Sequence, residues 1–195
     1  MPLSFRVGLK TLALVFFIGM AAGGYLVLAQ GRNTAFVPLA NHPPASSSDP
    51  DSVQAFFCPD EQCAQQLIGK IDSANRTIDM AIYSFTLPEI ELALVRAQER
   101  GIKIRVIMDA SQAGGEYSVD EPLIRAGIPV KIFSPPGRGI MHDKITIIDS
   151  QLVATGSFNY TQNADQYNNE NLVFLHDEPL ARQYETEFEK IWNAS

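Results

Sequence analysis

The sequence predicts an α/β domain built on a mixed β-sheet with helices on both faces. Strand-like and helix-like segments alternate from residue 53 to the end of the chain, which is typical of a layered α/β protein. Two strands within residues 139–161 are joined so closely that they predict a hairpin, and part of the sheet must then be antiparallel. With 195 residues, one domain with a substantial core is expected and a second catalytic domain is not.

The individual elements follow from hydrophobic period and from the residues that begin or end them. Strands are expected where β-branched and aromatic residues cluster, and helices where apolar residues recur every three to four positions. The expected strands are 53–57, 76–85, 103–109, 129–133, the two of the hairpin, and one near 171–175. The expected helices are 60–74, the segment between Thr86 and Gly101, 119–126 and 179–192. Asp60 is expected to cap the first helix, and Thr86 with Glu89 forms a capping box for the second.

The first 30 residues are expected to direct export. Residues 11–29 carry no charged side chain, and as a helix they would be about 28 Å long, enough to cross a bilayer. Arg6 and Lys10 precede this run, and positive charge keeps that end in the cytoplasm. The length favours an uncleaved anchor, whereas Val-Leu-Ala at 27–29 resembles the cleavage site of a signal peptide. Both alternatives predict a periplasmic domain, held at the inner membrane in the first case.

Residues 31–52 are expected to be a flexible tether, because they are rich in Pro, Ser and Asn and lack apolar periodicity. The folded domain is then 53–195, and His42 in the tether is expected to be solvated. The formal net charge is −7, and beyond residue 29 the chain has 13 basic against 22 acidic side chains, a balance of −9. Bulk charge therefore does not favour binding of a polyanion, so any anionic substrate has to be held by a local cluster.

The hairpin carries the polar side chains best suited to chemistry. Residues two apart on a strand share a face, so His142 and Lys144 project together, whereas Asp149 is an odd number of positions away and projects to the other side. The alternative is a structural histidine beside a lysine whose aliphatic part packs at the strand end. One histidine without a nearby carboxylate pair offers too few ligands for a zinc or two-metal centre, so no metal is expected.

The register of the hairpin decides what lies opposite this pair. A two-residue turn at 150–151 would place Lys144 opposite Ser157. The same register would place His142 opposite Asn159. An imidazole ringed by an ammonium, a hydroxyl and an amide offers one nucleophile or proton carrier with donors around it, which suits a phosphodiester. A slip by one residue would undo this arrangement.

The stretch HDKITIID followed by GSFN resembles the signature of the phospholipase D superfamily, His-x-Lys with four residues before Asp and then Gly-Ser-x-Asn. The matching positions are His142, Lys144, Asp149, Gly156, Ser157 and Asn159. The resemblance extends from about residue 52 to 192 and is strongest to small bacterial endonucleases of the superfamily, with mitochondrial cardiolipin hydrolases as cousins. It implies a phospholipase D-like fold in one domain.

The resemblance also implies a reaction. His142 would attack phosphorus and form a phosphohistidine, while Lys144, Ser157 and Asn159 would hold the non-bridging oxygens as charge builds on them. No cofactor is implied. Nucleic acid and membrane phospholipid are both superfamily substrates, so an exported endonuclease and a phospholipase or cardiolipin hydrolase are both open. An inactive phosphate-binding module is a third alternative.

The resemblance also implies roles for three further residues. Asp149 and Gly156 would be structural. Glu170, in NNENLVF, matches the glutamate that orients the nucleophilic histidine in the family, and the alternative is a solvated loop carboxylate. His176 matches no family position and is expected at the surface.

A single motif supplies one histidine where the reaction needs a second imidazole to protonate the leaving oxygen. Neither His42 nor His176 is a credible acid, so a two-fold homodimer is expected, in which His142 of each protomer meets in one shared cleft.

Cys58 and Cys63 are the two cysteines of the chain. In an exported domain, a pair with four residues between them predicts a local disulfide. Free thiols, or a zinc site shared between two chains, are the alternatives.

Overall fold

The computed structural model describes residues 52–195 of the chain. The segment predicted to direct export and the predicted tether up to residue 51 lie outside the described residues. Between residue 52 and the C-terminus, no helix combines the length and the apolar character that crossing a bilayer requires.

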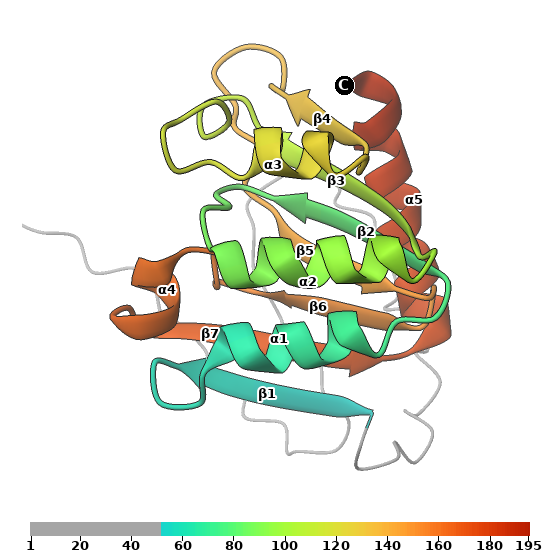
Figure 1. Cartoon of the computed structure of the whole chain (residues 1–195). Coiled ribbons are helices and arrows are strands. Elements are labelled where there is room, and N and C mark those ends of the chain that lie inside the picture. The colour runs from blue at the N-terminus through green and yellow to red at the C-terminus, as the bar shows by residue number, and fades with distance from the viewer. Residues whose placement is uncertain (1–51) are drawn as a thin grey trace, which may run out of the picture. The chain divides into compact units, whose positions relative to one another are not determined.

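Seven strands form one mixed sheet in the order β1-β7-β6-β5-β2-β3-β4 (Figure 1). The strands are β1 (Val53–Cys58), β2 (Thr77–Ile82), β3 (Lys103–Asp109), β4 (Val130–Phe133), β5 (Lys144–Ile148), β6 (Leu152–Gly156) and β7 (Glu170–His176). The strands β2, β3 and β4 run parallel to one another, and every other pairing is antiparallel. The mixed sheet expected from the sequence is therefore confirmed.

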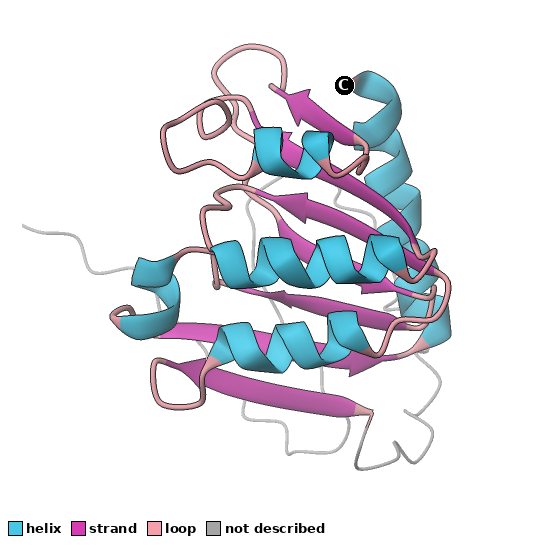
Figure 2. Ribbon diagram, viewed as in Figure 1, coloured by secondary structure: helices cyan, strands magenta, loops and turns pink. Residues whose placement is uncertain are grey.

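Helices cover both faces of this sheet, as predicted (Figure 2). The helices are α1 (Cys63–Asp72), α2 (Pro88–Glu99), α3 (Asp120–Arg125), α4 (Gln162–Gln166) and α5 (Glu178–Ala194). The larger core lies under α1, α2 and α3, where Leu67 and Leu94 are fully buried with Phe174 of the sheet. A second core lies under α5, which buries Phe188 against the opposite face. Apolar burial on both faces fixes the three layers.

Two helix starts differ from the predicted ones. Helix α1 begins after Gln62, because the chain first makes a turn in which the Glu61 N–H donates to the Phe57 carbonyl. Helix α2 begins after Leu87, so the predicted capping box does not form. The reason is tertiary: the N–H groups of Thr86 and Leu87 both donate to the Tyr160 carbonyl, at 2.9 and 3.0 Å, and fix the chain before the helix.

The hairpin register also differs by one residue from the predicted one. Ile148 pairs with Leu152, so three residues form the turn between β5 and β6. Asp149 and Ser150 in this turn both have left-handed backbone, with φ of 57° and 60°. Continuing the observed register places Lys144 level with Gly156 instead of Ser157. Strand pairing alone therefore does not bring together the four polar side chains of the predicted site. Their positions also depend on the path of the chain after β6, which carries Ser157 and Asn159.

Asp149 lies at the edge of the sheet opposite to Lys144 and caps the entrance to β2. Its carboxylate accepts hydrogen bonds from the backbone N–H groups of Asn75, Arg76 and Thr77, at 2.9, 2.7 and 3.0 Å. Burial raises the pKa of Asp149, but these backbone hydrogen bonds outweigh it and hold the pKa below its ordinary value. The aspartate of the motif therefore connects β2 to the hairpin.

Replacing Asp149 by Asn is expected to lower the free energy of unfolding by about 1–2 kcal/mol at neutral pH, because charge-assisted hydrogen bonds become neutral ones. A carboxylate with a lowered pKa stabilises the fold above its unfolded pKa of about 3.9 and loses this effect as pH falls through the folded value. The difference between wild type and variant should therefore shrink on acidification. Urea unfolding at pH 7 and pH 3 measures it, and reduced kcat with unchanged stability would contradict a structural role.

Candidate active site

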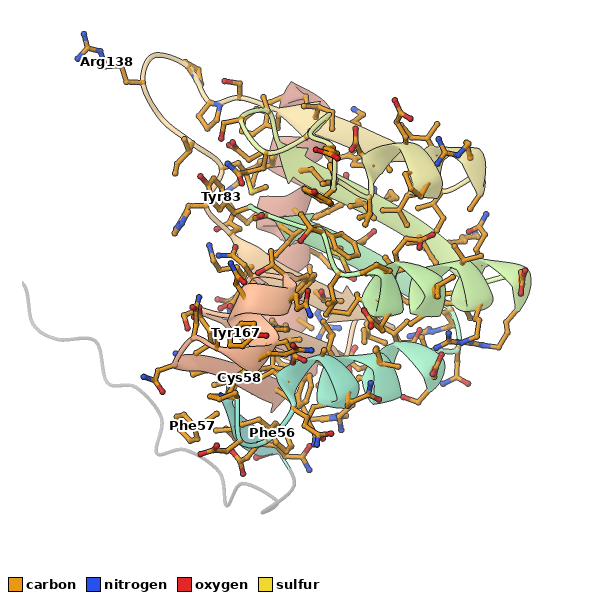
Figure 3. The ribbon with its side chains drawn as sticks, turned by 60° about the vertical axis from the view of Figure 1, so that its left-hand side comes forward. Phe56, Phe57, Cys58, Tyr83, Arg138 and Tyr167 are labelled. Carbon is orange, nitrogen blue, oxygen red and sulfur yellow. A yellow bond between two sulfur atoms is a disulfide. The ribbon has the colours of Figure 1, made fainter. Side chains whose placement is uncertain are left out.

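Apart from Asp149 at the opposite edge, most of the predicted site residues lie at the edge of the sheet where β2, β3 and β4 end. The start of β5, the end of β6 and the start of β7 lie at the same edge, because these strands alternate in direction. The loops that follow β2, β3, β4 and β6 therefore surround one patch. Figure 3 shows Tyr83 on this side and Arg138 at the tip of the β4–β5 loop, pointing away from the sheet. The carboxyl ends of parallel strands are the usual place for a ligand site in open α/β sheets.

Tyr83 brings His142 and Lys144 together. Its ring centroid lies 4.7 Å from that of His142 and 5.1 Å from the Lys144 Nζ. The Nζ also donates a 2.9 Å hydrogen bond to the His142 carbonyl. Lys144 is 8% exposed, whereas His142, which precedes β5, is exposed. The result is an accessible imidazole beside a cation fixed in place by the fold.

Burial sets the electrostatics of Lys144. It lowers the pKa of the ammonium below its ordinary value, and the negative charges of Asp143 and Glu170 only partly oppose this. An ammonium that is held away from water by protein contacts interacts strongly with an anion placed next to it. The position is therefore suited to stabilising a phosphoryl group.

Asp109 holds the backbone just before His142 in place, and the sequence analysis did not identify this residue. Its carboxylate is 2% exposed and accepts a 2.7 Å hydrogen bond from the N–H of Met141, the residue before His142. Burial raises the pKa of Asp109, but hydrogen bonds from Ser111 and Met141, with the positive charge of His142, bring it below its ordinary value. The N–H of Tyr83 donates to the Asp143 carbonyl at 2.8 Å on the other side of the histidine. Both flanks of His142 are thereby held.

Gly156 lets the chain leave β6 against β7. Its φ is 149°, and a Cβ at this position would lie 2.2 Å from the Asn171 carbonyl oxygen. No other residue fits without moving β7. The N–H groups of Ser157 and Phe158 then donate to that same Asn171 oxygen, at 3.1 and 3.3 Å. This close crossing fixes where Ser157 and the residues after it lie.

Ser157 and Glu170 form a hydrogen-bonded pair. The Ser157 hydroxyl donates to the Glu170 carboxylate, which also accepts from the Asn168 amide at 3.0 Å. The Ser157 oxygen accepts from the Asn171 N–H at 3.1 Å. Within residues 52–195 no hydrogen bond joins Glu170 to His142, so the role predicted for this glutamate in orienting His142 stays a prediction. The contact that the structure shows is with Ser157, whose hydroxyl Glu170 orients.

Asn159 lies in the loop that follows β6. It is half-buried, and its Oδ1 is buried without a hydrogen-bond partner among the described residues. It lines a hollow that Tyr83 also lines.

The remaining predicted residues lie away from this patch or support its border. His176 ends β7 at the opposite edge of the sheet. Cys58 and Cys63 are joined in a disulfide at the end of β1, and Cys58 pairs in register with Glu170. His42 lies outside the described residues. From residue 52 onward, no three His, Cys, Asp or Glu side chains lie close enough together to hold a metal ion.

Comparison with known proteins assigns the family. Residues 67–192 match the family described as "Cardiolipin synthase, PLD-like domain". A phospholipase D of Rickettsia felis is 35% identical over 186 residues, covering 89% of this chain and 90% of the relative. A mitochondrial cardiolipin hydrolase of Xenopus tropicalis is 33% identical over 119 residues, covering 61% of this chain and 56% of the relative.

Solved structures give the same assignment. The phospholipase D family member Nuc from Salmonella typhimurium is 35% identical, with a TM-score of 0.68 over 73% of this chain and 94% of that one. NucT from Helicobacter pylori is 29% identical, with a TM-score of 0.69 over 72% and 95%. The chain therefore belongs to the phospholipase D-like family. It is a phosphodiester hydrolase.

Proposed function

We propose that the protein is an exported endonuclease that hydrolyses DNA or RNA through a phosphohistidine intermediate and needs no metal ion. The observation that carries this proposal is the exposed imidazole of His142 beside the buried ammonium of Lys144, held by Tyr83. A nucleophile next to a fixed cation is the arrangement that attack on a phosphodiester requires. The likeness to Nuc, which extends over 94% of that chain, supports a nuclease.

The reaction has two displacements at phosphorus. A ring nitrogen of His142 attacks, the P–N bond forms, and the P–O bond to one nucleoside breaks as its oxygen takes up a proton. Water then attacks the phosphohistidine, breaks the P–N bond and releases the phosphate monoester. Lys144, Ser157 and Asn159 hold the non-bridging oxygens in both steps, where negative charge increases. The cation at this site is an amino group, so turnover is expected to survive chelation.

A second candidate is hydrolysis of membrane phospholipid by the same chemistry. The names of the relatives in Rickettsia felis and Xenopus tropicalis, phospholipase D and cardiolipin hydrolase, favour it. So does the run at residues 11–29, which as a helix could hold the enzyme at its lipid. The acidic balance of the chain also disfavours tight nonspecific binding of nucleic acid. An inactive phosphate-binding module is less well supported, because His142 is exposed and accessible.

Parallel assays on single-stranded DNA, duplex DNA and cardiolipin vesicles distinguish the candidates. The proposal predicts cleavage of nucleic acid at a rate that EDTA does not change. Turnover of cardiolipin without any nucleic-acid cleavage would refute the nuclease. Loss of activity with EDTA and its recovery with Mg²⁺ would refute the metal-independent route.

We also propose that the active enzyme is a two-fold homodimer with one shared cleft. In residues 52–195 the candidate site has one imidazole, and His176 lies at the other edge of the sheet. A second copy would bring a second His142 to protonate the leaving oxygen, and it would double the donors. The two imidazoles would act as a coupled pair, so the rate should fall at both low and high pH.

Dilution tests the shared cleft. Specific activity per chain should decrease as the protein is diluted through its dimer dissociation constant, in parallel with the mass measured by light scattering or mass photometry. A monomer with constant specific activity at all concentrations would exclude the shared cleft.

A further inference from the structure

A hollow of about 580 Å³ lies next to Tyr83, the residue that contacts both His142 and Lys144. Tyr83 connects the hollow to this pair, because its ring contacts His142 and also lines the hollow. The other walls come from the loops after β3 and β6 and from the segment around α4, with Gln112, Tyr117 and Asn163 among the lining residues. Its volume lies within the range of small-molecule sites.

The chemistry of the lining is unusual for this chain. Every lining side chain is neutral, and each is a tyrosine, serine, threonine, asparagine or glutamine. The whole chain has 22 acidic and 15 basic residues, yet none of them lines this hollow. A phosphate subsite would need cations, and an acyl chain would need aliphatic walls. The lining therefore suits a ligand part that is uncharged, polar and planar.

The details of the walls agree with this. The Gln112 amide donates a 3.1 Å hydrogen bond to the Tyr83 hydroxyl, which fixes one aromatic wall. Tyr117 supplies a second aromatic side chain and is 74% exposed, so its ring is free to contact a ligand. Asn159 is a further amide side chain among the lining residues. Tyr117 also lines a second hollow, which contains Glu89. The negative charge of Glu89 would repel a phosphate, so the nucleic-acid backbone is not expected to run through that hollow.

We propose that this hollow is a nucleobase subsite, which binds the base of a nucleotide next to the scissile phosphate in a single strand. Tyrosine rings stack on any base, and amide side chains supply the paired donors and acceptors that base edges require. Duplex DNA keeps its bases stacked and paired inside the helix, so the subsite selects single strands. This inference rests on the proposed nuclease function.

Two pairs of small substrates test the subsite in the full-length enzyme. Thymidine p-nitrophenyl phosphates, joined through the 5′ or the 3′ oxygen, carry a base, whereas methyl p-nitrophenyl phosphate does not. The readout is the ratio of kcat/KM for the thymidine ester to kcat/KM for the methyl ester. Tyr117→Ala and Asn163→Ala should each lower this ratio about fivefold or more. Both residues are exposed, so their replacement should leave thermal unfolding unchanged.

Tyr167→Ala is the matched control. Tyr167 has nearly the same exposure as Tyr117, 72% against 74%, and does not line the hollow. Figure 3 shows it on the same side of the molecule as Tyr83. Its replacement should leave the ratio unchanged. Unchanged ratios in the Tyr117 and Asn163 variants, or an equal decrease in the control, would overturn the subsite while nuclease activity stands. If these two variants impair cardiolipin turnover and leave the thymidine ratio unchanged, the hollow binds a lipid head group instead.

The failure of the nuclease itself gives a different result. In that case neither single-stranded DNA nor the thymidine esters are hydrolysed, while cardiolipin vesicles are. This outcome overturns the subsite together with the proposed function, and wild-type enzyme alone is sufficient to detect it.

Discussion

Replacing His142 by Ala is expected to lower kcat by at least about 10³-fold, because the variant lacks the group that forms the bond to phosphorus. The imidazole is exposed, so its removal should leave the free energy of unfolding nearly unchanged. Steady-state kinetics on the preferred substrate and urea unfolding measure both quantities on the same preparation.

His176→Ala is the control for this variant. His176 is also exposed, but it ends β7 at the opposite edge of the sheet and should be dispensable for activity. Substantial turnover by the His142 variant, or equal losses in both variants, would show that the nucleophile has been assigned to the wrong residue.

Replacing Lys144 by Met is expected to reduce kcat/KM by about 10²–10³-fold, because the fixed cation is lost where charge builds in the transition state. Stability should not decrease, since an apolar side chain of similar length replaces a buried ammonium. Lys144→Arg should not restore activity, because a planar guanidinium presents its donors in a different geometry from the compact ammonium beside Tyr83.

The lowered pKa of Lys144 gives this prediction a pH signature. A lysine that loses its proton more readily when folded makes the fold more stable as pH rises through its folded pKa. Activity should meanwhile fall on the alkaline side before the range of an ordinary lysine, near 10.4. A Lys144→Met variant with wild-type kcat/KM would refute the electrostatic role.

The sequence was informative where a pattern is local. The strand at 103–109 was predicted with the bounds that β3 has, because its β-branched run is flanked by a glycine and a loop. Strand parity predicted that His142 and Lys144 project together, and both side chains contact the ring of Tyr83. Asp149 was predicted to project away from them, and it lies in the turn after β5, where its backbone is left-handed. Helices on both faces also followed from the alternation of segments.

What the sequence did not predict depends on contacts between distant segments. The capping box before α2 fails because the Tyr160 carbonyl, more than 70 positions away, takes the N–H groups of Thr86 and Leu87. The predicted hairpin register was wrong by one residue, because the sequence does not signal a turn with two consecutive left-handed residues, Asp149 and Ser150. Helix α4 was missed because five residues are too few to show a period.

The same limit applies to the site. Asp109, which ends β3, binds the N–H of Met141, and Tyr83, which follows β2, contacts His142. The order of strands that brings them there cannot be predicted from a local sequence pattern. The one available signal was position, since a carboxylate that ends a buried strand lies at the ligand-binding edge of such sheets. Glu170 was identified by family resemblance, and its observed partner is Ser157.

Trapping the covalent intermediate tests whether His142 is the nucleophile. The enzyme is mixed with substrate, denatured within one turnover at alkaline pH, where phosphohistidine persists, and digested for mass spectrometry. We expect a phosphoryl or nucleotidyl adduct on His142 that is absent from the His142→Ala variant. Rapid hydrolysis without any adduct, or an adduct on another residue, would contradict this assignment.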